Sequence, residues 1–277
     1  MEINSAYFDE EFPNLPLRRL FQKWEVAYFD RADAIVVVSS YLKEYLQRHG
    51  ANPDKILVNQ NGVSTDIVDL KGVGDVRARH GIPAEAFVIG YVGGMEAFRR
   101  LPEVVRHIAD LRKAGNTDLY FIIVGDGGDM DAVQAAICSE RNVLAGAVVL
   151  TGWLPHQEVV PYLSTFDVAI FPFTNAYCSP LKLFEYLGAG IPTLGPDTPA
   201  VREVFQDGVH LKLVRQDGSD FAEKVLELKA DPELRKKLGK EGQRLVLSEY
   251  TWEKNAERVV RHMEKFVRPA AKPADST

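Results

Sequence analysis

Short apolar runs alternate with amphipathic stretches along residues 31–214, and this alternation predicts a layered α/β protein. The apolar runs are rich in β-branched and aromatic residues, which is typical of strands buried on both faces of a parallel sheet. Between the runs, apolar residues recur at helical spacing, as in 101–111. The larger, later part of the pattern predicts strands at 87–94, 119–124, 148–152, 167–171, 191–194 and 211–214. Strands that alternate with helices in this way predict a doubly wound, mostly parallel Rossmann-like sheet.

The beginning of the chain carries a shorter version of the same pattern. A β-branched run at 33–39, helical spacing at 40–49 and a second run at 55–58 predict one β-α-β unit. An amphipathic helix precedes this unit, with apolar residues at helical spacing from 17 to 28 and basic residues on its other face. Because about 60 residues are too few for a complete doubly wound domain, we expect an incomplete α/β segment here.

Composition and charge narrow the class of protein. With 46% apolar residues the chain can fill a core, and its net charge of −6 is spread along the sequence, which argues against a nucleic-acid groove. The 2 cysteines lie far apart, which fits a reducing, cytoplasmic compartment, and the 6 histidines are isolated, so no metal site is expected. No apolar run is long enough to span a membrane. We expect a soluble protein, and the basic helix face leaves contact with the inner membrane surface open as an alternative to a solvated face.

One helix start in the second half of the chain carries two charges on one face. Ser179 is a favourable N-cap and Pro180 suits the first helical position, so we expect the helix to open at Pro180. The backbone N–H groups of Leu181 and Lys182 then point out of the positive helix end, where an anion is stabilised. Glu185 lies three residues beyond Lys182 on the same face. The pair predicts either a site for a phosphate and a nearby hydroxyl, or an ordinary surface salt bridge.

Glycine turns follow the predicted strands. Gly125 and Gly127 begin like a dinucleotide fingerprint, but Met130 stands where the third glycine would be, which argues against NAD binding. This turn either brings backbone close to a ligand or only reverses the chain. A P-loop and a Gly-x-Ser-x-Gly nucleophile motif are absent from the sequence, which lowers the case for a nucleotide triphosphatase or a hydrolase.

Two of these turns are expected to meet. The first strand of the larger sheet ends in Gly93 and Gly94, with Arg99 shortly after, and the fourth strand leads to Lys182 and Glu185. The first and fourth strands are neighbours in a doubly wound order, so these groups converge on the switch-point crevice. Two cations and helix amides that hold a diphosphate, with a carboxylate that accepts from ribose hydroxyls, form a complete nucleotide site.

Several motifs occur in the order seen in retaining glycosyltransferases of family 4, which have the two-domain GT-B fold. The resemblance spans nearly the whole chain and rests on Asn61-Gly62-Val63, Gly93-Gly94 with Arg99, Val124-Gly125-Asp126-Gly127, the block 179–186 and Tyr250-Thr251-Trp252. It implies a nucleotide-sugar donor bound mainly by the C-terminal domain, retention at the anomeric carbon, and no obligatory metal or cofactor.

The resemblance also implies roles by position. Arg99 corresponds to the basic residue on the diphosphate, Glu185 to the ribose-binding glutamate, and the stretch 179–182 to the phosphate-facing helix start. Trp153 and Leu154 would flank the nucleobase.

Two positions depart from the family pattern. Tyr177 stands where members often have a glutamate eight residues before the ribose glutamate, so a contact to the donor sugar is lost or made differently. Gly94 stands where many members have arginine, which leaves Arg99, with Arg100 or Lys182, to carry the charge that faces the phosphates.

The domain order follows from the resemblance. Residues 1–66 would close the N-terminal, acceptor-side domain, 67–85 would be a linker, and 86–249 would form the C-terminal nucleotide-sugar-binding domain. Residues 250–267 would be a helix that packs back on the N-terminal part, and the tail 268–277, which has no core residue, is expected to be disordered.

The sequence therefore predicts a GT-B glycosyltransferase that moves a sugar from a nucleotide-diphosphate donor to a sugar, lipid or polysaccharide acceptor. No catalytic residue is assignable from the sequence. Two alternatives stay open: a non-catalytic nucleotide-sugar-binding half that needs a partner chain to supply the missing N-terminal region, and a GT-B epimerase or hydrolase that acts on the donor.

Overall fold

The computed structural model describes residues 1–4, 16–68 and 75–266, which divide into two compact units. The first unit consists of Met1–Gln60 together with the chain from Trp252 onward, and the second unit is Asn61–Thr251. The predicted tail at 268–277 lies outside the described residues. The chain thus enters the second unit at Asn61 and leaves it after Thr251.

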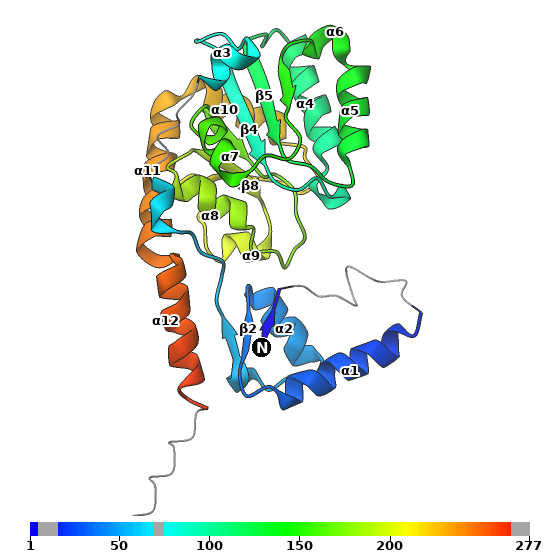
Figure 1. The fold of residues 1–277 in the computed structure, drawn as a ribbon, viewed down its shortest axis with the longest axis vertical. Helices are drawn as coiled ribbons and strands as arrows, with labels where there is room; N and C mark the ends of the chain where they lie inside the picture. The colour runs from blue at the N-terminus through cyan, green and yellow to red at the C-terminus, as the bar shows by residue number, and fades with distance from the viewer. Residues whose placement is uncertain (5–15, 69–74, 267–277) are drawn as a thin grey trace, which may run out of the picture. The chain divides into compact units, whose positions relative to one another are not determined.

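The first unit is built on a 3-stranded parallel sheet in the order β1-β2-β3 (Figure 1). Its elements are β1 (Glu2–Ile3), α1 (Arg18–Arg31), β2 (Ile35–Val37), α2 (Ser40–Arg48), η2 (Pro53–Lys55), β3 (Ile56–Val58) and α12 (Trp252–Met263). The predicted β-α-β unit is present as β2, α2 and β3. Ser39 caps α2, because its hydroxyl accepts a hydrogen bond from the N–H of Leu42 at 3.4 Å.

Two helices of this unit differ in what they bury. α12 buries polar side chains that contact β3 and the segment after it: Asn255 Nδ2 donates to the Gln60 carbonyl at 2.8 Å, and His262 Nε2 lies 2.9 Å from the Lys55 carbonyl. α1, with the Leu17 that precedes it, buries Phe29 but leaves apolar side chains between 42% and 71% exposed, namely Leu17, Leu20, Trp24 and Tyr28. The amphipathic pattern of residues 17–28 therefore has an apolar side that the other described elements of the first unit leave exposed.

The second unit contains a 6-stranded parallel sheet in the order β6-β5-β4-β7-β8-β9. Its strands are β4 (Phe87–Val92), β5 (Leu119–Val124), β6 (Val148–Leu150), β7 (Val168–Ile170), β8 (Thr193–Pro196) and β9 (Lys212–Val214). Its longer helices are α4 (Leu101–Lys113), α5 (Met130–Ser139), α7 (His156–Leu163), α8 (Leu181–Gly188), α10 (Phe221–Ala230) and α11 (Pro232–Glu249). Its short helices are η3 (Thr65–Val68), α3 (Val76–His80), η4 (Ala97–Arg99), α6 (Arg141–Leu144) and α9 (Pro199–Arg202).

This architecture confirms the predicted doubly wound parallel sheet. Every residue of β4 is buried, as expected for a strand whose two faces are both covered by helices. The order of the strands reverses at β4, which lies between β5 and β7. The loops after β4 and β7 therefore adjoin at the carboxyl edge of the sheet, which is where ligands bind in such folds.

Glycines set the distance between α8 and α11. A Cβ on Gly239 would lie 2.3 Å from the Gly190 carbonyl oxygen, and one on Gly242 would lie 2.6 Å from a Leu187 methyl group. The absence of these side chains lets α11 pack directly on α8 and the turn that ends it.

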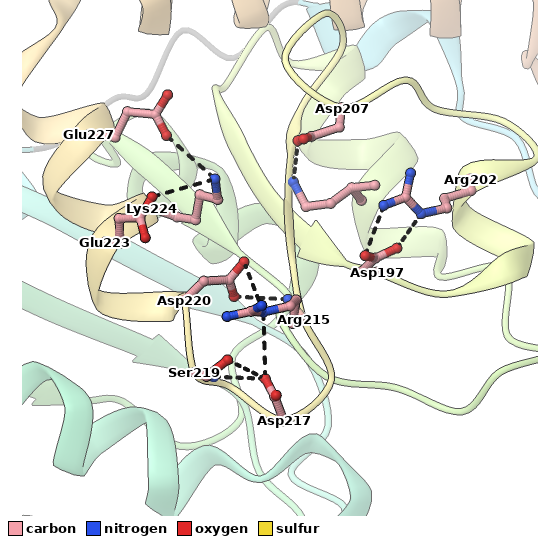
Figure 2. A network of polar contacts seen from close by, with 11 residues as sticks. Asp197, Arg202, Asp207, Arg215, Asp217, Ser219, Asp220, Glu223, Lys224 and Glu227 are labelled. Atoms are coloured by element: carbon pink, nitrogen blue, oxygen red, sulfur yellow. Dashed lines mark hydrogen bonds and ion pairs between the residues drawn. The ribbon is translucent and has the colours of Figure 1, made fainter.

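A network of polar contacts ties the edge strand β9 to its surroundings (Figure 2). The carboxylate of Asp207 accepts from the Leu213 N–H at 2.8 Å, and that of Asp220 accepts from the Arg215 N–H at 2.9 Å. Lys212 Nζ contacts the Glu227 carboxylate at 2.8 Å. Because side chains satisfy backbone groups at this edge, the strand is a poor template for pairing with another chain.

Candidate functional site

Two glycine loops interlock at the carboxyl edge of β4 and β5. The Met95 N–H donates to the Asp126 carbonyl at 3.0 Å. A Cβ on Gly125 would lie 2.0 Å from the Gly93 carbonyl oxygen, and one on Gly127 would lie 2.5 Å from the Met95 nitrogen. Glycine is therefore required at both positions so that the two backbones can approach. The turn does more than reverse the chain, because it joins two loops into one packed surface.

A buried tyrosine fixes the Gly94 end of this surface. The hydroxyl of Tyr91 donates to the Gly94 carbonyl at 2.6 Å. Burial raises the pKa of Tyr91, and this outweighs the opposite effect of the nearby Arg99 charge, so the phenol stays protonated as a donor. The ring also stacks on Phe171 with centroids 6.0 Å apart, which links the end of β4 to the residue that follows β7.

Arg99 lies where the loops after β4 and β7 meet. Its Nη1 donates to the Thr174 hydroxyl at 2.8 Å, and its guanidinium lies 4.2 Å from the centre of the Phe171 ring. The Arg99 Nε is 3.4 Å from the Glu96 carboxylate. Within the described residues no protein group accepts from Nη2, so that end of the guanidinium is available to an anion. The structure thus brings Arg99 to the switch point, as the predicted strand order requires.

Arg100 has a different place. Its guanidinium donates to both carboxylate oxygens of Glu103 and to the Gln216 carbonyl, and it stacks on Phe173 at 4.1 Å. Arg100 also has a φ of 52°, a conformation that side chains other than glycine rarely adopt. Its donors are committed to the protein, so of the two neighbouring arginines Arg99 is the one free to face a phosphate.

The start of α8 differs from the sequence prediction. The helix begins at Leu181, one residue later than expected, and Pro180 occupies the N-cap position with an extended ψ of 113°. Ser179 does not cap the helix: its hydroxyl accepts from the Asn61 N–H at 3.3 Å, and its carbonyl accepts from Asn61 Nδ2 at 2.5 Å. The local pattern missed this because Asn61 lies 118 residues away.

The first two amides of α8 remain open as a result. The N–H groups of Leu181 and Lys182 have no intrahelical acceptor, and no side chain in the described chain caps them. Lys182 Nζ lies 2.6 Å from the Glu185 carboxylate, so the predicted pairing on one face is present. Their side chains are 27% and 19% exposed, which keeps both within reach of a ligand at the edge of the sheet.

A third loop brings an exposed aromatic ring. The Gly125 N–H donates to the Gly152 carbonyl at 3.0 Å, which joins the loop after β6 to the interlocked glycine loops. Trp153 follows and is 71% exposed, whereas Leu154 packs against the core. A flat, exposed indole offers a stacking surface for a planar ring.

Tyr177 is the position that departs from the family pattern. Its side chain is only 3% exposed, and its hydroxyl accepts from Asn175 Nδ2 at 3.0 Å. The loop after β7 therefore holds a neutral, hydrogen-bonded pair at this position. Sequence reasoning gave no role to three residues that shape the site, Asn61, Phe171 and Thr174; the Asn-Gly turn after β3 was the one local signal among them.

No group of three or more His, Cys, Asp or Glu side chains within the described ranges of the chain is placed to hold a metal ion. No helix in the same ranges is long and apolar enough to cross a membrane.

The sequence matches two family descriptions that fit this geometry. Residues 99–261 match "Glycosyl transferase-like", and residues 6–67 match "Glycosyltransferase Family 4". The chain belongs to the family 4 glycosyltransferases. In this family 4 chain the longer match covers α4 through most of α12, and so includes α8 with Lys182 and Glu185.

The chain is also similar to curated proteins, one of which is named as a putative glycosyltransferase. The family 4 chain is 29% identical over 221 residues to the putative teichuronic acid biosynthesis glycosyltransferase TuaH of Bacillus subtilis, which covers 76% of this chain and 52% of the relative. It is 24% identical over 247 residues to the alpha-maltose-1-phosphate synthase of Mycolicibacterium smegmatis, with coverage of 83% and 62%. The chain thus spans between about half and three-fifths of the length of these two relatives.

Solved structures show the fold. HepE of Anabaena in complex with UDP and glucose has a TM-score of 0.79 at 14% identity, covering 95% of this chain and 70% of HepE. TarM has a TM-score of 0.69 at 16% identity, covering 89% of this chain and 46% of TarM. The family 4 chain therefore has the GT-B type of α/β fold.

Proposed function

We propose that this chain binds a nucleotide-diphosphate sugar at the carboxyl edge of β4 and β7 and transfers the sugar with retention at its anomeric carbon. The observation that carries the proposal is the convergence of the Arg99 guanidinium and the uncapped start of α8 on the switch point of the sheet. Both are suited to a diphosphate, one as a cation and the other as a pair of open amides. The HepE structures that share this fold hold UDP with glucose, or UDP-glucose.

Each nearby group has a chemical task in this proposal. Negative charge grows on the departing diphosphate, and Arg99 Nη2, the α8 amides and Lys182 stabilise it. Glu185, whose Lys182 contact leaves its other carboxylate oxygen unengaged among the described residues, accepts from ribose hydroxyls. Trp153 stacks on the nucleobase, and Leu154 supports it from the core side. Gly93, Gly94, Gly125 and Gly127 supply backbone that a sugar or phosphate can approach without a side chain in between.

The acceptor is proposed to be a sugar, a lipid or a polysaccharide. A second candidate function is a nucleotide-sugar-binding half that needs further α/β structure before it transfers the sugar. The exposed apolar side of α1 and the 3-stranded sheet of the first unit favour it, because both offer surface that more structure would cover.

Thermal unfolding in the presence of UDP, GDP, ADP and dTDP tests donor binding first. We expect one diphosphate to raise the melting temperature, and the matching nucleotide sugar to bind at the same site. Radiolabelled sugar transfer to an acceptor panel then separates the two candidates: transfer supports the enzyme, and binding without transfer supports the half. Donor breakdown without an acceptor would instead indicate a donor epimerase or hydrolase. If no diphosphate stabilises the chain, the donor-site proposal is wrong.

A further inference from the structure

The segment before α8 has two ways to start the helix. A Ser-Pro pair is a strong local signal for serine as N-cap and proline as the first helical residue. In that arrangement Pro180 would have helical ψ and the Ser179 hydroxyl would accept from the N–H of Leu181 or Lys182. The structure has the other arrangement, with Pro180 extended at ψ 113° and no side-chain cap.

Asn61 accounts for the arrangement that is present. Its N–H donates to the Ser179 hydroxyl at 3.3 Å and its Nδ2 donates to the Ser179 carbonyl at 2.5 Å, so the hydroxyl and the carbonyl of that serine are both engaged. Ser179 is 5% exposed, and water therefore offers little competition for these bonds. The serine that would cap the helix is held away from it.

The backbone around Asn61 is itself fixed. Two residues on, the Val63 N–H donates to the Tyr250 carbonyl at 2.9 Å, and Val63 forms a parallel bridge with Thr251. Val63 is buried at 2% exposure and packs on α8, since a Cβ on Gly188 of that helix would lie 3.4 Å from the Val63 methyl groups. Asn61 thus reaches Ser179 from a segment that packs on the same helix, which makes the contact stiff.

We propose that Asn61 is a positioning residue for the diphosphate site, and that it acts by keeping the Ser179 hydroxyl from capping α8. This rests on the proposed function, in which the open amides of Leu181 and Lys182 hold the diphosphate. A serine cap would occupy one of these amides and compete with the ligand for it. Asn61 itself need not touch the ligand, since its backbone N–H and its Nδ2 both donate to Ser179.

Two single variants and their combination test this idea on the full chain, with UDP, GDP and ADP as probes in calorimetry. Asn61→Ala keeps the backbone N–H that donates to the Ser179 hydroxyl but removes the Nδ2 bond that holds the Ser179 carbonyl. Without that stronger bond we expect residue 179 to turn toward the helix and cap it, so that diphosphate affinity falls about tenfold, which corresponds to the usual strength of a serine cap. Ser179→Ala has no hydroxyl to cap with and retains affinity within about threefold. The double variant N61A/S179A also lacks the competing cap, so we expect it to recover most of the affinity lost in N61A.

Recovery of diphosphate affinity in the double variant distinguishes a positioning role of Asn61 from a general loss of structure around α8. A purely structural role for Asn61 predicts that the second deletion weakens binding further or leaves it unchanged. Amide hydrogen exchange adds a direct readout: the Leu181 and Lys182 amides should gain protection in N61A and lose it again in the double variant. Asn116→Ala is the matched control, because its Nδ2 likewise donates to a backbone carbonyl, that of Leu111, at 3.1 Å.

The failures of the two proposals look different. If wild type binds none of the diphosphates, the proposed donor site is wrong. The proposal for Asn61 can still be tested in that case, because unchanged protection of the Leu181 and Lys182 amides in N61A would show that Ser179 does not cap α8 when the Asn61 side chain is removed. If wild type binds a diphosphate and N61A binds it equally well, or the double variant shows no recovery, the role of Asn61 is wrong and the donor site stands. Circular dichroism of each variant checks that it is folded.

Discussion

The Tyr186 hydroxyl forms hydrogen bonds with both backbone polar groups of Val92, at the end of β4. It accepts from the Val92 N–H at 2.7 Å and donates to the Val92 carbonyl at 3.0 Å. The pairing of β4 with β7 is recorded at Ile89 and Gly90, so Val92 lies beyond it and its backbone groups on that side need another partner. The hydroxyl of Tyr186 on α8 is that partner. These two bonds fix α8, which carries the proposed phosphate site, to the central strand β4.

Tyr186→Phe is expected to lower the free energy of unfolding by about 1 to 3 kcal/mol, because a buried N–H and a buried carbonyl both lose their partner. Urea denaturation measures this. Tyr120→Phe is the control: its hydroxyl has no hydrogen-bond partner within the described residues, and the loss should stay within about 0.5 kcal/mol. Equal stability of the two variants would contradict the structural role of the Tyr186 hydroxyl.

Gly125→Ala should be strongly destabilising. The new Cβ would lie 2.0 Å from the Gly93 carbonyl oxygen, and the residue has a φ of 138° that alanine rarely adopts. We expect a loss of about 2 kcal/mol or more in the free energy of unfolding. Gly128→Ala, three residues on, meets nothing within 4 Å and should change stability by less than about 1 kcal/mol in the same urea titration.

Arg99→Ala should weaken UDP, or whichever diphosphate binds best, by about tenfold to a hundredfold in calorimetry, as expected for the loss of charge-assisted hydrogen bonds to phosphate. Arg100→Ala should lower the melting temperature, because it removes the contacts to Glu103 and Gln216, while affinity at temperatures where it is folded stays near that of wild type. The reverse outcome, with affinity lost in R100A and retained in R99A, would exchange the roles of the two arginines.

Glu185→Ala should weaken diphosphate affinity by at least about fivefold if the carboxylate holds the ribose. The stronger test compares the ribonucleotide with its 2′,3′-dideoxy analogue. Wild type should prefer the ribonucleotide, and E185A should bind the two alike. A preference that survives in E185A would show that Glu185 serves only the ion pair with Lys182.

Stability should fall as the pH drops below about 7, partly because of His80. Burial first, and the Arg79 charge second, lower the pKa of His80 in the folded state below its usual 6.5. The unfolded chain then takes up the proton more readily, so the contribution is complete above the unfolded pKa and is lost as pH falls through the folded one. Urea midpoints from pH 8 to pH 5 should show a shallower decline in H80Q, although not a flat one, because burial also lowers the pKa of His210.

Several features of this protein followed from the sequence alone. The β-branched runs and the glycine turns were enough to predict a parallel doubly wound sheet, because burial on both faces leaves strands with almost no polar residues. The neighbouring positions of β4 and β7, and with them the convergence of Arg99 and the α8 region, followed from the strand order that such sheets adopt. The pairing of Lys182 with Glu185 followed from helical spacing.

Only the tertiary structure decided how the start of α8 is built and which arginine is free. The Ser-Pro signal predicts a capped helix that opens at Pro180, but two hydrogen bonds from Asn61 shift the start to Leu181 and leave its amides open. The family resemblance points to Arg99 by position, but only the contacts give the reason: Glu103 and Gln216 engage Arg100, whereas Thr174 and Phe171 orient Arg99. Local propensities are worth about 1 kcal/mol, so a pair of buried contacts between segments over a hundred residues apart can override them, and no local pattern records such contacts.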